Sequence, residues 1–126
     1  MNKKNTLLLF LCLFTLWAVA QEKKPVKIAC VGNSITYGSG IKNQFQNSYP
    51  GLLSQLLGEG YDVRNFGISA RVMLNKGDHP YMHEQKFRDL LAFQPDIVTI
   101  KLGTNDSKPW NWCYGKDFGK DLTEML

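Results

Sequence analysis

Residues that bind metals or form disulfides are scarce in this chain of 126 residues, which has two histidines and three cysteines. His79 and His83 are four positions apart, but Pro80 disfavours a helix through His79 and no third ligand is evident. We therefore interpret them as surface or substrate-rim histidines and predict no metal and no cofactor. Three cysteines are too few for a disulfide framework, and the sequence leaves open whether Cys30 and Cys113 pair.

Clustered charge, internal repeats and low-complexity tracts are also missing. The formal net charge is +4, and two of the basic residues, Lys3 and Lys4, belong to the N-terminal segment. The remaining lysines are scattered rather than gathered on one predicted face. This distribution predicts no surface for nucleic acid.

The N-terminal segment has the pattern of a secretory signal peptide. Lys3 and Lys4 precede an apolar run of about fourteen residues, which is short of the ~20 that a bilayer-spanning helix needs. Small residues at Ala18 and Ala20 suit a cleavage site, so we expect residues 1–20 to be removed and the mature chain to begin at Gln21. An uncleaved membrane anchor is the alternative. Cleavage would leave a secreted or periplasmic protein without a stable membrane anchor.

The pattern of the remaining residues predicts an α/β fold with a parallel sheet. Short apolar runs rich in β-branched residues, each closed by a glycine turn, predict strands at 26–31, 61–65 and 96–102. Helical periodicity predicts helices from Pro50 to Gly58, from about Met82 to the residue before Pro95, and from near Lys116. We interpret residues 41–48, 68–81 and 108–115 as loops. Cys30 lies in the first strand, so we expect it to be a small buried hydrophobe.

Polar turns follow all three predicted strands: Gly32-Asn33-Ser34, Asn65-Phe66-Gly67 and Gly103-Thr104-Asn105-Asp106. In an open parallel sheet these turns lie at the same edge. They offer a hydroxyl, an unobstructed backbone N–H and a carboxamide, the groups that an acyl-transfer site needs as nucleophile and oxyanion donors. Each turn has an ordinary alternative, because residues 33–40 can be a flexible loop and Gly67 and Asn105 are common turn formers.

These segments resemble the SGNH (GDSL-type) hydrolases. G-N-S-I-T at residues 32–36 is similar to the family's first block, N-F-G at 65–67 to the second and G-T-N-D at 103–106 to the third. The run from Lys101 to Trp112 resembles secreted bacterial members related to sialate O-acetylesterases. The resemblance implies a three-layer α/β/α, flavodoxin-like fold over residues 21–126 and the hydrolysis of esters.

The resemblance also implies roles for particular residues. Ser34 would be the nucleophile, and its own N–H, the N–H of Gly67 and the side-chain amide of Asn105 would form the oxyanion hole. Asn33 stands where the family usually has Asp, with similar shape and hydrogen bonding. Apart from the resemblance, we expect Asp106 and Lys108 to hold the loop of residues 108–115 in place beside Asn105. The final glycine of a G-x-S-x-G elbow is missing, which disfavours the α/β-hydrolase alternative.

One part of the family pattern has no match in the chain. The D-x-x-H block, which supplies the general base and its carboxylate partner, would lie beyond Leu126. We therefore expect a truncated polypeptide, with a naturally minimal domain as the alternative. A serine hydroxyl is a weak nucleophile without a base, so we expect residues 1–126 to hydrolyse esters poorly or not at all.

Aromatic residues follow the third block. Trp110, Trp112 and Tyr114 could line a substrate rim and stack on a sugar, or they could simply pack the loop against the last helix. The leading hypothesis is an exported serine esterase that removes acetyl or short acyl groups from glycans or small-molecule esters. A lysophospholipase or thioesterase with the same mechanism, and a noncatalytic glycan- or anion-binding remnant, are the alternatives.

Overall fold

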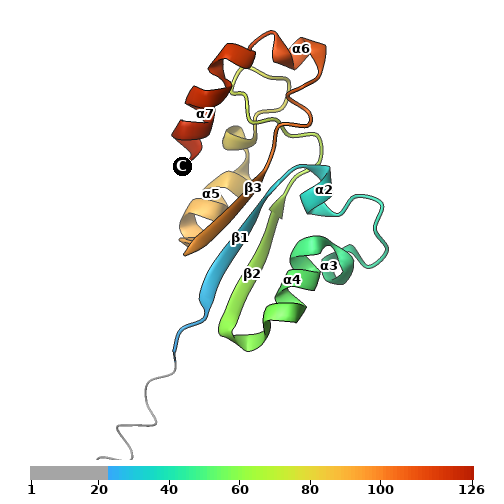
Figure 1. Ribbon diagram of the computed structural model, residues 1–126, viewed down its shortest axis with the longest axis vertical. Coiled ribbons are helices and arrows are strands. Elements are labelled where there is room, and N and C mark those ends of the chain that lie inside the picture. Colours follow the sequence, from blue (N-terminus) through green and yellow to red (C-terminus); the bar gives the residue numbers. More distant parts are fainter. Residues whose placement is uncertain (1–22) are drawn as a thin grey trace, which may run out of the picture.

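The computed structural model describes residues 23–126, which form one parallel sheet with helices on both faces (Figure 1). The strands are β1 (Val26–Gly32), β2 (Tyr61–Gly67) and β3 (Ile97–Lys101), in the order β2-β1-β3. Both β2 and β3 pair with β1 in parallel. The predicted α/β fold and its three parallel strands are confirmed. The predicted signal peptide lies outside the described residues.

The central strand β1 is the most deeply buried. Its last five residues are buried, and Ala29, Cys30 and Val31 have no exposed surface. Side chains alternate between the two faces of a strand, so a strand buried on both faces needs an unbroken apolar run, as residues 28–31 provide. The buried position predicted for Cys30 is confirmed, and Cys30 and Cys113 are both free thiols in this structure.

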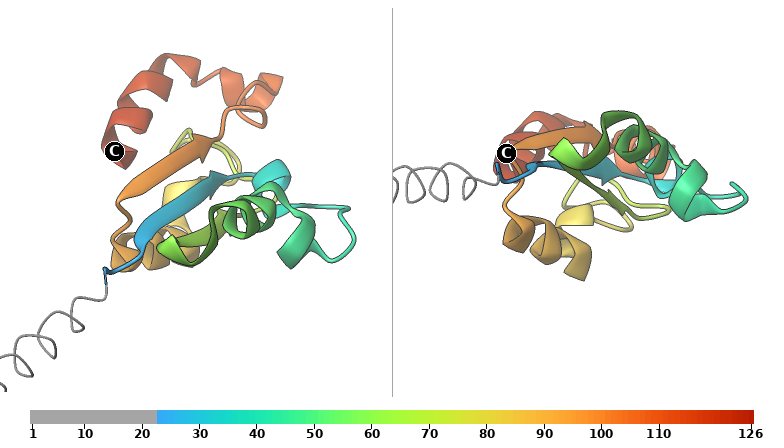
Figure 2. Two further views of the ribbon diagram at one scale, coloured as in Figure 1. Left: turned by 60° about the horizontal axis from the view of Figure 1, so that its bottom comes forward. Right: turned by 90° about the horizontal axis from the view of Figure 1, so that it is seen from below.

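Two helices cover opposite faces of the sheet. Helix α4 (Tyr49–Leu57) packs against β2 on one face, and α5 (Gln85–Phe93) lies on the other (Figure 2). Pro50 lies in the first turn of α4, where its missing N–H costs no intrahelical bond, and Gly58 ends the helix with a positive φ. Both features were predicted. The layered α/β/α arrangement follows from these two helices.

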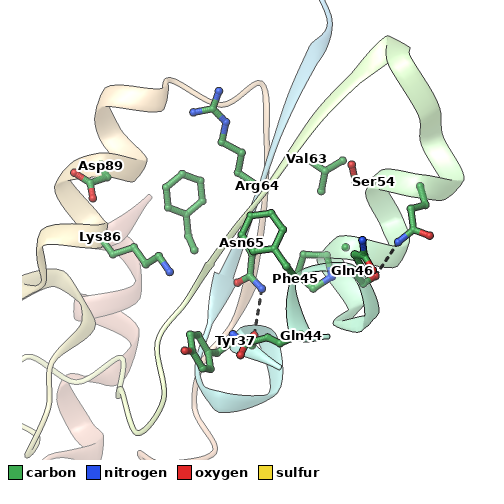
Figure 3. A pocket seen from close by; sticks show the side chains of 14 residues that line it. Tyr37, Gln44, Phe45, Gln46, Ser54, Val63, Arg64, Asn65, Lys86 and Asp89 are labelled. Atoms are coloured by element: carbon green, nitrogen blue, oxygen red, sulfur yellow. Dashed lines mark hydrogen bonds between the residues drawn. The ribbon is translucent and has the colours of Figure 1, made fainter. Parts of the chain in front are cut away.

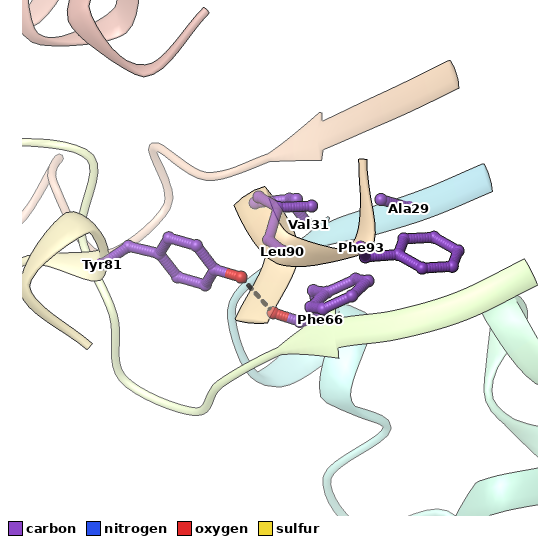
Figure 4. Close-up of a cluster of buried hydrophobic side chains, with 6 residues drawn as sticks. All are labelled: Ala29, Val31, Phe66, Tyr81, Leu90 and Phe93. Atoms are coloured by element: carbon purple, nitrogen blue, oxygen red, sulfur yellow. Dashed lines mark hydrogen bonds between the residues drawn. The ribbon is translucent and has the colours of Figure 1, made fainter. Parts of the chain in front are cut away.

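The main core lies between the sheet and α5. It is formed by six buried side chains (Figure 4): Ala29, Val31, Phe66, Tyr81, Leu90 and Phe93. The rings of Phe66 and Phe93 are 5.6 Å apart, and the Tyr81 hydroxyl donates a hydrogen bond to the Phe66 carbonyl. Burial raises the pKa of Tyr81, so its phenol stays protonated and keeps this bond. Met125 of α7 (Phe118–Met125) packs against the same cluster.

Several one-turn helices were not predicted. They are α2 (Ser34–Tyr37), α3 (Gln44–Asn47) and α6 (Pro109–Trp112), together with 3₁₀ turns at Gly58–Gly60, Tyr81–His83 and Gly115–Asp117. The prediction of loops at 41–48 and 108–115 is therefore wrong in part. A four-residue helix is too short to show a helical period, and capping and tertiary contacts decide whether it forms. The second predicted helix begins at Gln85 rather than Met82, because Glu84 is extended.

Strand β3 is the least covered strand of the sheet. Ile97 is 47% exposed and Val98 is 42% exposed, although the two side chains point to opposite faces. Within residues 23–126, β1 is its only strand partner. In the same part of the chain, no helix has the length and apolar character to cross a bilayer.

Candidate active site

Ser34 is the first residue of α2, and only Asn33 separates it from the end of β1. Asn33 caps this helix: its buried Oδ1 accepts a hydrogen bond from the Ile35 N–H at 3.1 Å. A side chain at Gly32 would lie 2.1 Å from Thr36 Oγ1 and 2.8 Å from the Lys101 carbonyl, so only glycine permits this turn. These contacts hold Ser34, which is half-buried, at the carboxyl edge of the sheet.

Asn65 joins the end of β2 to α2. Its Nδ2 donates to the Thr36 carbonyl at 2.8 Å, and its Oδ1 accepts from the Gly67 N–H at 2.8 Å. The predicted oxyanion donor at Gly67 therefore already has an acceptor in this structure. Gly67 also lies against α2, because a Cβ there would be 2.2 Å from the Tyr37 nitrogen. The contacts of Gly67 thus explain why a glycine is needed at this position.

The loop after β2 supplies a backbone group that the sequence did not indicate. Ala70 has a φ of 67°, which is rare for a residue with a Cβ, and its N–H has no acceptor within residues 23–126. Ser69 on one side contacts Ser39 with the two Oγ atoms 2.7 Å apart, and the Arg71 carbonyl on the other side accepts from Asn105. No sequence signal predicts a left-handed alanine, because alanine favours other conformations.

Arg71 fixes the shape of this loop. Its guanidinium forms an ion pair with Glu84 at 2.8 Å and donates to the Ser69 carbonyl at 3.0 Å. Both side chains of the ion pair are partly buried. The loop around Ala70 is therefore held from both ends, by Ser39 and by Glu84.

Asn105 and Asp106 follow β3 through a turn in which Gly103 has a φ of 113°. Asn105 Nδ2 donates to the Arg71 carbonyl at 3.1 Å, which orients the amide and leaves its second N–H without an acceptor within residues 23–126. Asp106 is fully buried, and its Oδ1 accepts from the Leu74 N–H at 2.8 Å. This contact ties the turn after β3 to the loop after β2. The expectation that Asp106 holds the aromatic loop beside Asn105 stays a prediction.

The register of the sheet brings the carboxyl ends of the three strands to one edge, although residues 65–67, predicted as a turn, form the end of β2. Gly32 pairs with Gly67 on one side and with Lys101 on the other, so the three strands end at the same level. Hydrogen bonds then link the segments in sequence: Ser39 to Ser69, and Arg71 to Asn105. The parallel register thus places a serine hydroxyl, free backbone N–H groups and a carboxamide along one rim.

Three aromatic residues near α6 are exposed. Trp110 is 60% exposed, its Nε1–H donates to Asp78 Oδ2 at 3.1 Å, and Lys108 Nζ lies 5.6 Å from the centre of its ring. Trp112 is 54% exposed but also packs on Phe118, at 6.1 Å between ring centres. Both tryptophans that we predicted to line a substrate rim are thus accessible. Trp112 in addition packs against the last helix, which was the alternative interpretation.

Within residues 23–126, no titratable side chain forms a hydrogen bond with the Ser34 hydroxyl. His79 and His83 are exposed, as predicted, and neither side chain hydrogen bonds to Ser34. The indole of Trp110 donates to Asp78 and lowers the pKa of that carboxyl below its ordinary value. Within residues 23–126, no cluster of three or more His, Cys, Asp or Glu residues could hold a metal ion.

A separate hollow of about 790 Å³ lies at the outer edge of β2, between α4 and α5 (Figure 3). Its lining includes Tyr37, Phe45, Asn65 and Lys86 and does not include Ser34, Gly67 or Asn105. Two contacts connect this lining to the segments around Ser34: Asn65 donates to the Tyr37 carbonyl at 3.4 Å, and Lys86 donates to the Gly67 carbonyl at 3.2 Å.

Comparison with known proteins assigns the chain to a family. The GDSL-like Lipase/Acylhydrolase family matches residues 30–125, so the chain belongs to this family of carboxylic ester hydrolases, and the resemblance to SGNH hydrolases is confirmed. The chain is also similar to a curated protein. The chain is 56% identical over 107 residues to a protein named acetylxylan esterase from Xylanibacter ruminicola.

That match covers 85% of the chain and 22% of the relative. The chain therefore spans about a fifth of the length of this relative. No solved structure matches the chain. The finer resemblance to sialate O-acetylesterases stays a prediction.

Proposed function

We propose that this chain contributes the nucleophile and the oxyanion donors of an exported esterase that removes acetyl or short acyl groups from carbohydrate. The observation that carries the proposal is the convergence of Ser34, the Ala70 loop and Asn105 at one sheet edge. Membership of an acylhydrolase family and the high identity to an acetylxylan esterase support the reaction and the substrate class.

In the proposed reaction, Ser34 Oγ attacks the carbonyl carbon of the ester while a general base takes the hydroxyl proton. The resulting oxyanion accepts hydrogen bonds from the Ser34 N–H and the free N–H of Asn105 Nδ2. The alcohol then leaves with a proton, and water hydrolyses the acyl-serine to release the carboxylate. We assign the base to residues outside 23–126, because neither histidine there hydrogen bonds to Ser34.

A third oxyanion donor follows β2. The Gly67 N–H can serve only if it gives up its bond to Asn65 Oδ1, whereas the Ala70 N–H has no acceptor within residues 23–126 to lose. Exchanging one hydrogen bond for another yields less stabilisation than using a free donor, so the geometry favours Ala70 over Gly67 in this role.

The substrate class rests on the exposed aromatic residues after the third turn. Trp110 and Trp112 lie on α6, a few residues after Asn105, and offer apolar faces on which a sugar ring can stack. Aromatic faces beside an ester-cleaving edge suit a carbohydrate alcohol better than a linear acyl chain. Sialate, xylan and other acetylated sugars all belong to this class.

The test uses the full-length protein and p-nitrophenyl acetate. We expect Ser34→Ala to abolish turnover and the wild type to form a transient acetyl-enzyme, with the acetyl group located on Ser34 by mass spectrometry of peptides. Ser54→Ala, on α4, is the matched control and should turn over the ester like the wild type. Retained turnover in Ser34→Ala would refute the proposed mechanism.

Residues 21–126 produced alone test the need for an external base. Serine hydrolases that lack a triad member retain about 10³–10⁴-fold catalysis over water. We expect at most this residual rate from the isolated segment. Vigorous turnover by the segment that depends on Ser34 would contradict the assignment of the base to other residues.

Export is tested by the N-terminus of the processed protein. Cleavage after Ala20 predicts that material recovered outside the cytoplasm begins at Gln21. Recovery of a chain that still begins at Met1 would contradict the proposed processing.

A further inference from the structure

A buried amide links the candidate oxyanion donor to the aromatic rim. Asn111 has 1% of its surface exposed, and its Nδ2 donates to the Asn105 carbonyl at 2.9 Å. The same amide group forms two hydrogen bonds with Asp78: Nδ2 donates to Oδ1 at 3.1 Å, and Oδ1 accepts from the Asp78 N–H at 2.9 Å. The side chain of Asn111 therefore has a partner for both of its N–H groups and for its oxygen.

Asp78 extends this chain of contacts to Trp110. Its second carboxylate oxygen, Oδ2, accepts from the Trp110 indole N–H at 3.1 Å, while Oδ1 is held by Asn111. Lys108 Nζ lies over the Trp110 ring at 5.6 Å from its centre. An exposed tryptophan would otherwise sample several rotamers, so these contacts fix the direction in which the ring faces.

We propose that Asn111 and Asp78 are positioning residues that hold the Asn105 amide and the Trp110 ring in one fixed relation, so that a glycan stacked on Trp110 presents its ester to the oxyanion donors. The proposal rests on the proposed function, because it assigns the geometry of the same site. It goes further in naming the side chains that couple substrate placement to catalysis.

The two positioning residues act on different parts of the site. Asn111 reaches the Asn105 backbone directly, so losing its amide frees the turn that carries the oxyanion donor. Asp78 contacts Trp110 but not Asn105, so losing its carboxylate frees the ring and affects the donor only through Asn111. We therefore expect loss of the Asn111 amide to lower mainly kcat, and loss of the Asp78 carboxylate to raise mainly KM for the glycan.

Trp112 shows that this arrangement is particular to Trp110. Its ring lies against Gly115, where a Cβ would be 2.9 Å from the indole, and against Phe118. Within residues 23–126 its indole N–H has no hydrogen-bond acceptor. Packing holds Trp112, whereas a hydrogen-bonded carboxylate directs Trp110.

The experiment compares two substrates in the full-length enzyme: p-nitrophenyl acetate, which has no sugar, and an acetylated xylo-oligosaccharide. For Asp78→Ala and Trp110→Phe we expect KM for the oligosaccharide to rise about tenfold relative to the change for the aryl ester, the effect of losing one interaction worth roughly 1.4 kcal/mol. Trp110→Phe retains an aromatic ring and removes only the indole N–H and part of the stacking surface.

For Asn111→Ala we expect kcat to fall about 10- to 100-fold on both substrates, somewhat less than the 10²–10³-fold typical of removing an oxyanion donor. Asp78→Asn is the conservative variant: its single oxygen can accept from Trp110 or from Asn111 but not from both, so its effect should be intermediate. If Asn111→Ala does not fold, Asp78→Ala and Asp78→Asn still decide the question, because Asp78 is exposed.

Two variants outside the site serve as controls. Asp117→Ala removes a partly buried carboxylate that pairs with the exposed Lys76, and Phe45→Ala removes an aromatic ring that is 95% exposed at the β2 edge. Both should leave the ratio of the two activities unchanged. Equal effects of Asp78→Ala on the two substrates, or no effect on either, would overturn the proposal. Retained turnover in Ser34→Ala would instead refute the proposed function, so the two failures are distinguishable.

Discussion

Individual polar side chains hold the three strand ends together at the carboxyl edge of the sheet. Asn65 links β2 to α2, and Asp106 links the turn after β3 to the loop that carries Ala70. Each side chain is largely shielded from water and bonds to a backbone group far away in the sequence. Removing such a partner leaves a buried backbone group unsatisfied, which costs more than the net value of the bond.

Asp106 offers a direct measure of this cost. Its Oδ1 accepts from the buried Leu74 N–H, whereas its Oδ2 has no hydrogen-bond partner in the described part of the chain, residues 23–126. We expect Asp106→Ala to lower the free energy of unfolding by about 1–3 kcal/mol, and Asp106→Asn to lower it less because it keeps one acceptor oxygen. Urea denaturation measures both. An equal loss for the two variants would show that the charge, not the Leu74 bond, matters.

Gly67 tests whether close packing against α2 explains the glycine. A Cβ at this position would lie 2.2 Å from the Tyr37 nitrogen, so the α2 backbone must move. We expect Gly67→Ala to destabilise the fold by about 1–3 kcal/mol and to impair acylation of Ser34. Gly60→Ala is the control, because nothing lies within 4 Å of a Cβ there. Thermal unfolding of the two variants should differ clearly.

We expect the hydrogen bond between Asp78 and Trp110 to depend on pH. The Trp110 indole is the main cause of the lowered pKa of Asp78; Asn111, His79 and Lys108 act in the same direction, and desolvation opposes them. A pKa lowered by folding gives a contribution that is complete above the ordinary pKa of about 4 and is lost as the pH falls through the folded-state value. We expect the indole N–H resonance of Trp110 to shift below about pH 4. In Asp78→Asn that acid shift should be absent.

Among the elements, α7 has a correctable weakness. Gly119 lies in its first turn, is exposed, and has nothing within 4 Å of a Cβ. Glycine is less favourable than alanine in a helix by up to about 1 kcal/mol, because it loses more backbone entropy on folding. We expect Gly119→Ala to raise the free energy of unfolding by a few tenths to about 1 kcal/mol. A calorimetric melting temperature at or below that of the wild type would contradict this.

The short element α2 shows how local and tertiary contacts cooperate. Asn33 caps its start, and Gly38 ends it with a φ of 90°. The side-chain amide of Asn65 on β2 donates a hydrogen bond to the Thr36 carbonyl of this helix. One helical turn is not stable in isolation. The position of the candidate nucleophile therefore depends on β2 as well as on its own segment.

For the molecule as a whole, the outer edge of β3 is the part of the surface that we expect to promote association with other chains. Ile97 and Val98 expose apolar surface on a strand that, within residues 23–126, pairs on one side only. Exposed strand edges favour association with other chains. We expect residues 23–126 produced alone to form larger species, as measured by light scattering, and Ile97→Lys to reduce their formation.

Leu56→Lys provides the matched control for that prediction. Leu56 is 84% exposed, but it lies on α4 rather than on a sheet edge. The added charge is the same in both variants, so a general effect of charge would act on both. Equal suppression by Leu56→Lys would show that the strand edge is not the cause.

Much of the fold follows from local patterns. The apolar runs predicted strands whose ends lie within two residues of the observed ones. Pro50 and Gly58 predicted the ends of α4 to within one residue. Such features are predictable because side-chain alternation and glycine or proline geometry act within a few residues. The one-turn helices and the left-handed Ala70 were not predictable, because contacts with distant segments stabilise them.

The sequence by itself determined which residue types occur at the strand ends: a serine, glycines and an asparagine, each after an apolar run that had to become a buried strand. Only the tertiary structure decided which of their groups are free. Among residues 23–126 it showed the Gly67 N–H bonded to Asn65, the Ala70 N–H without an acceptor, and Asn111 joined to both Asn105 and Asp78. The physical reason is that hydrogen-bond partners are set by distance in space, and in this fold the partners come from strands and loops tens of residues apart.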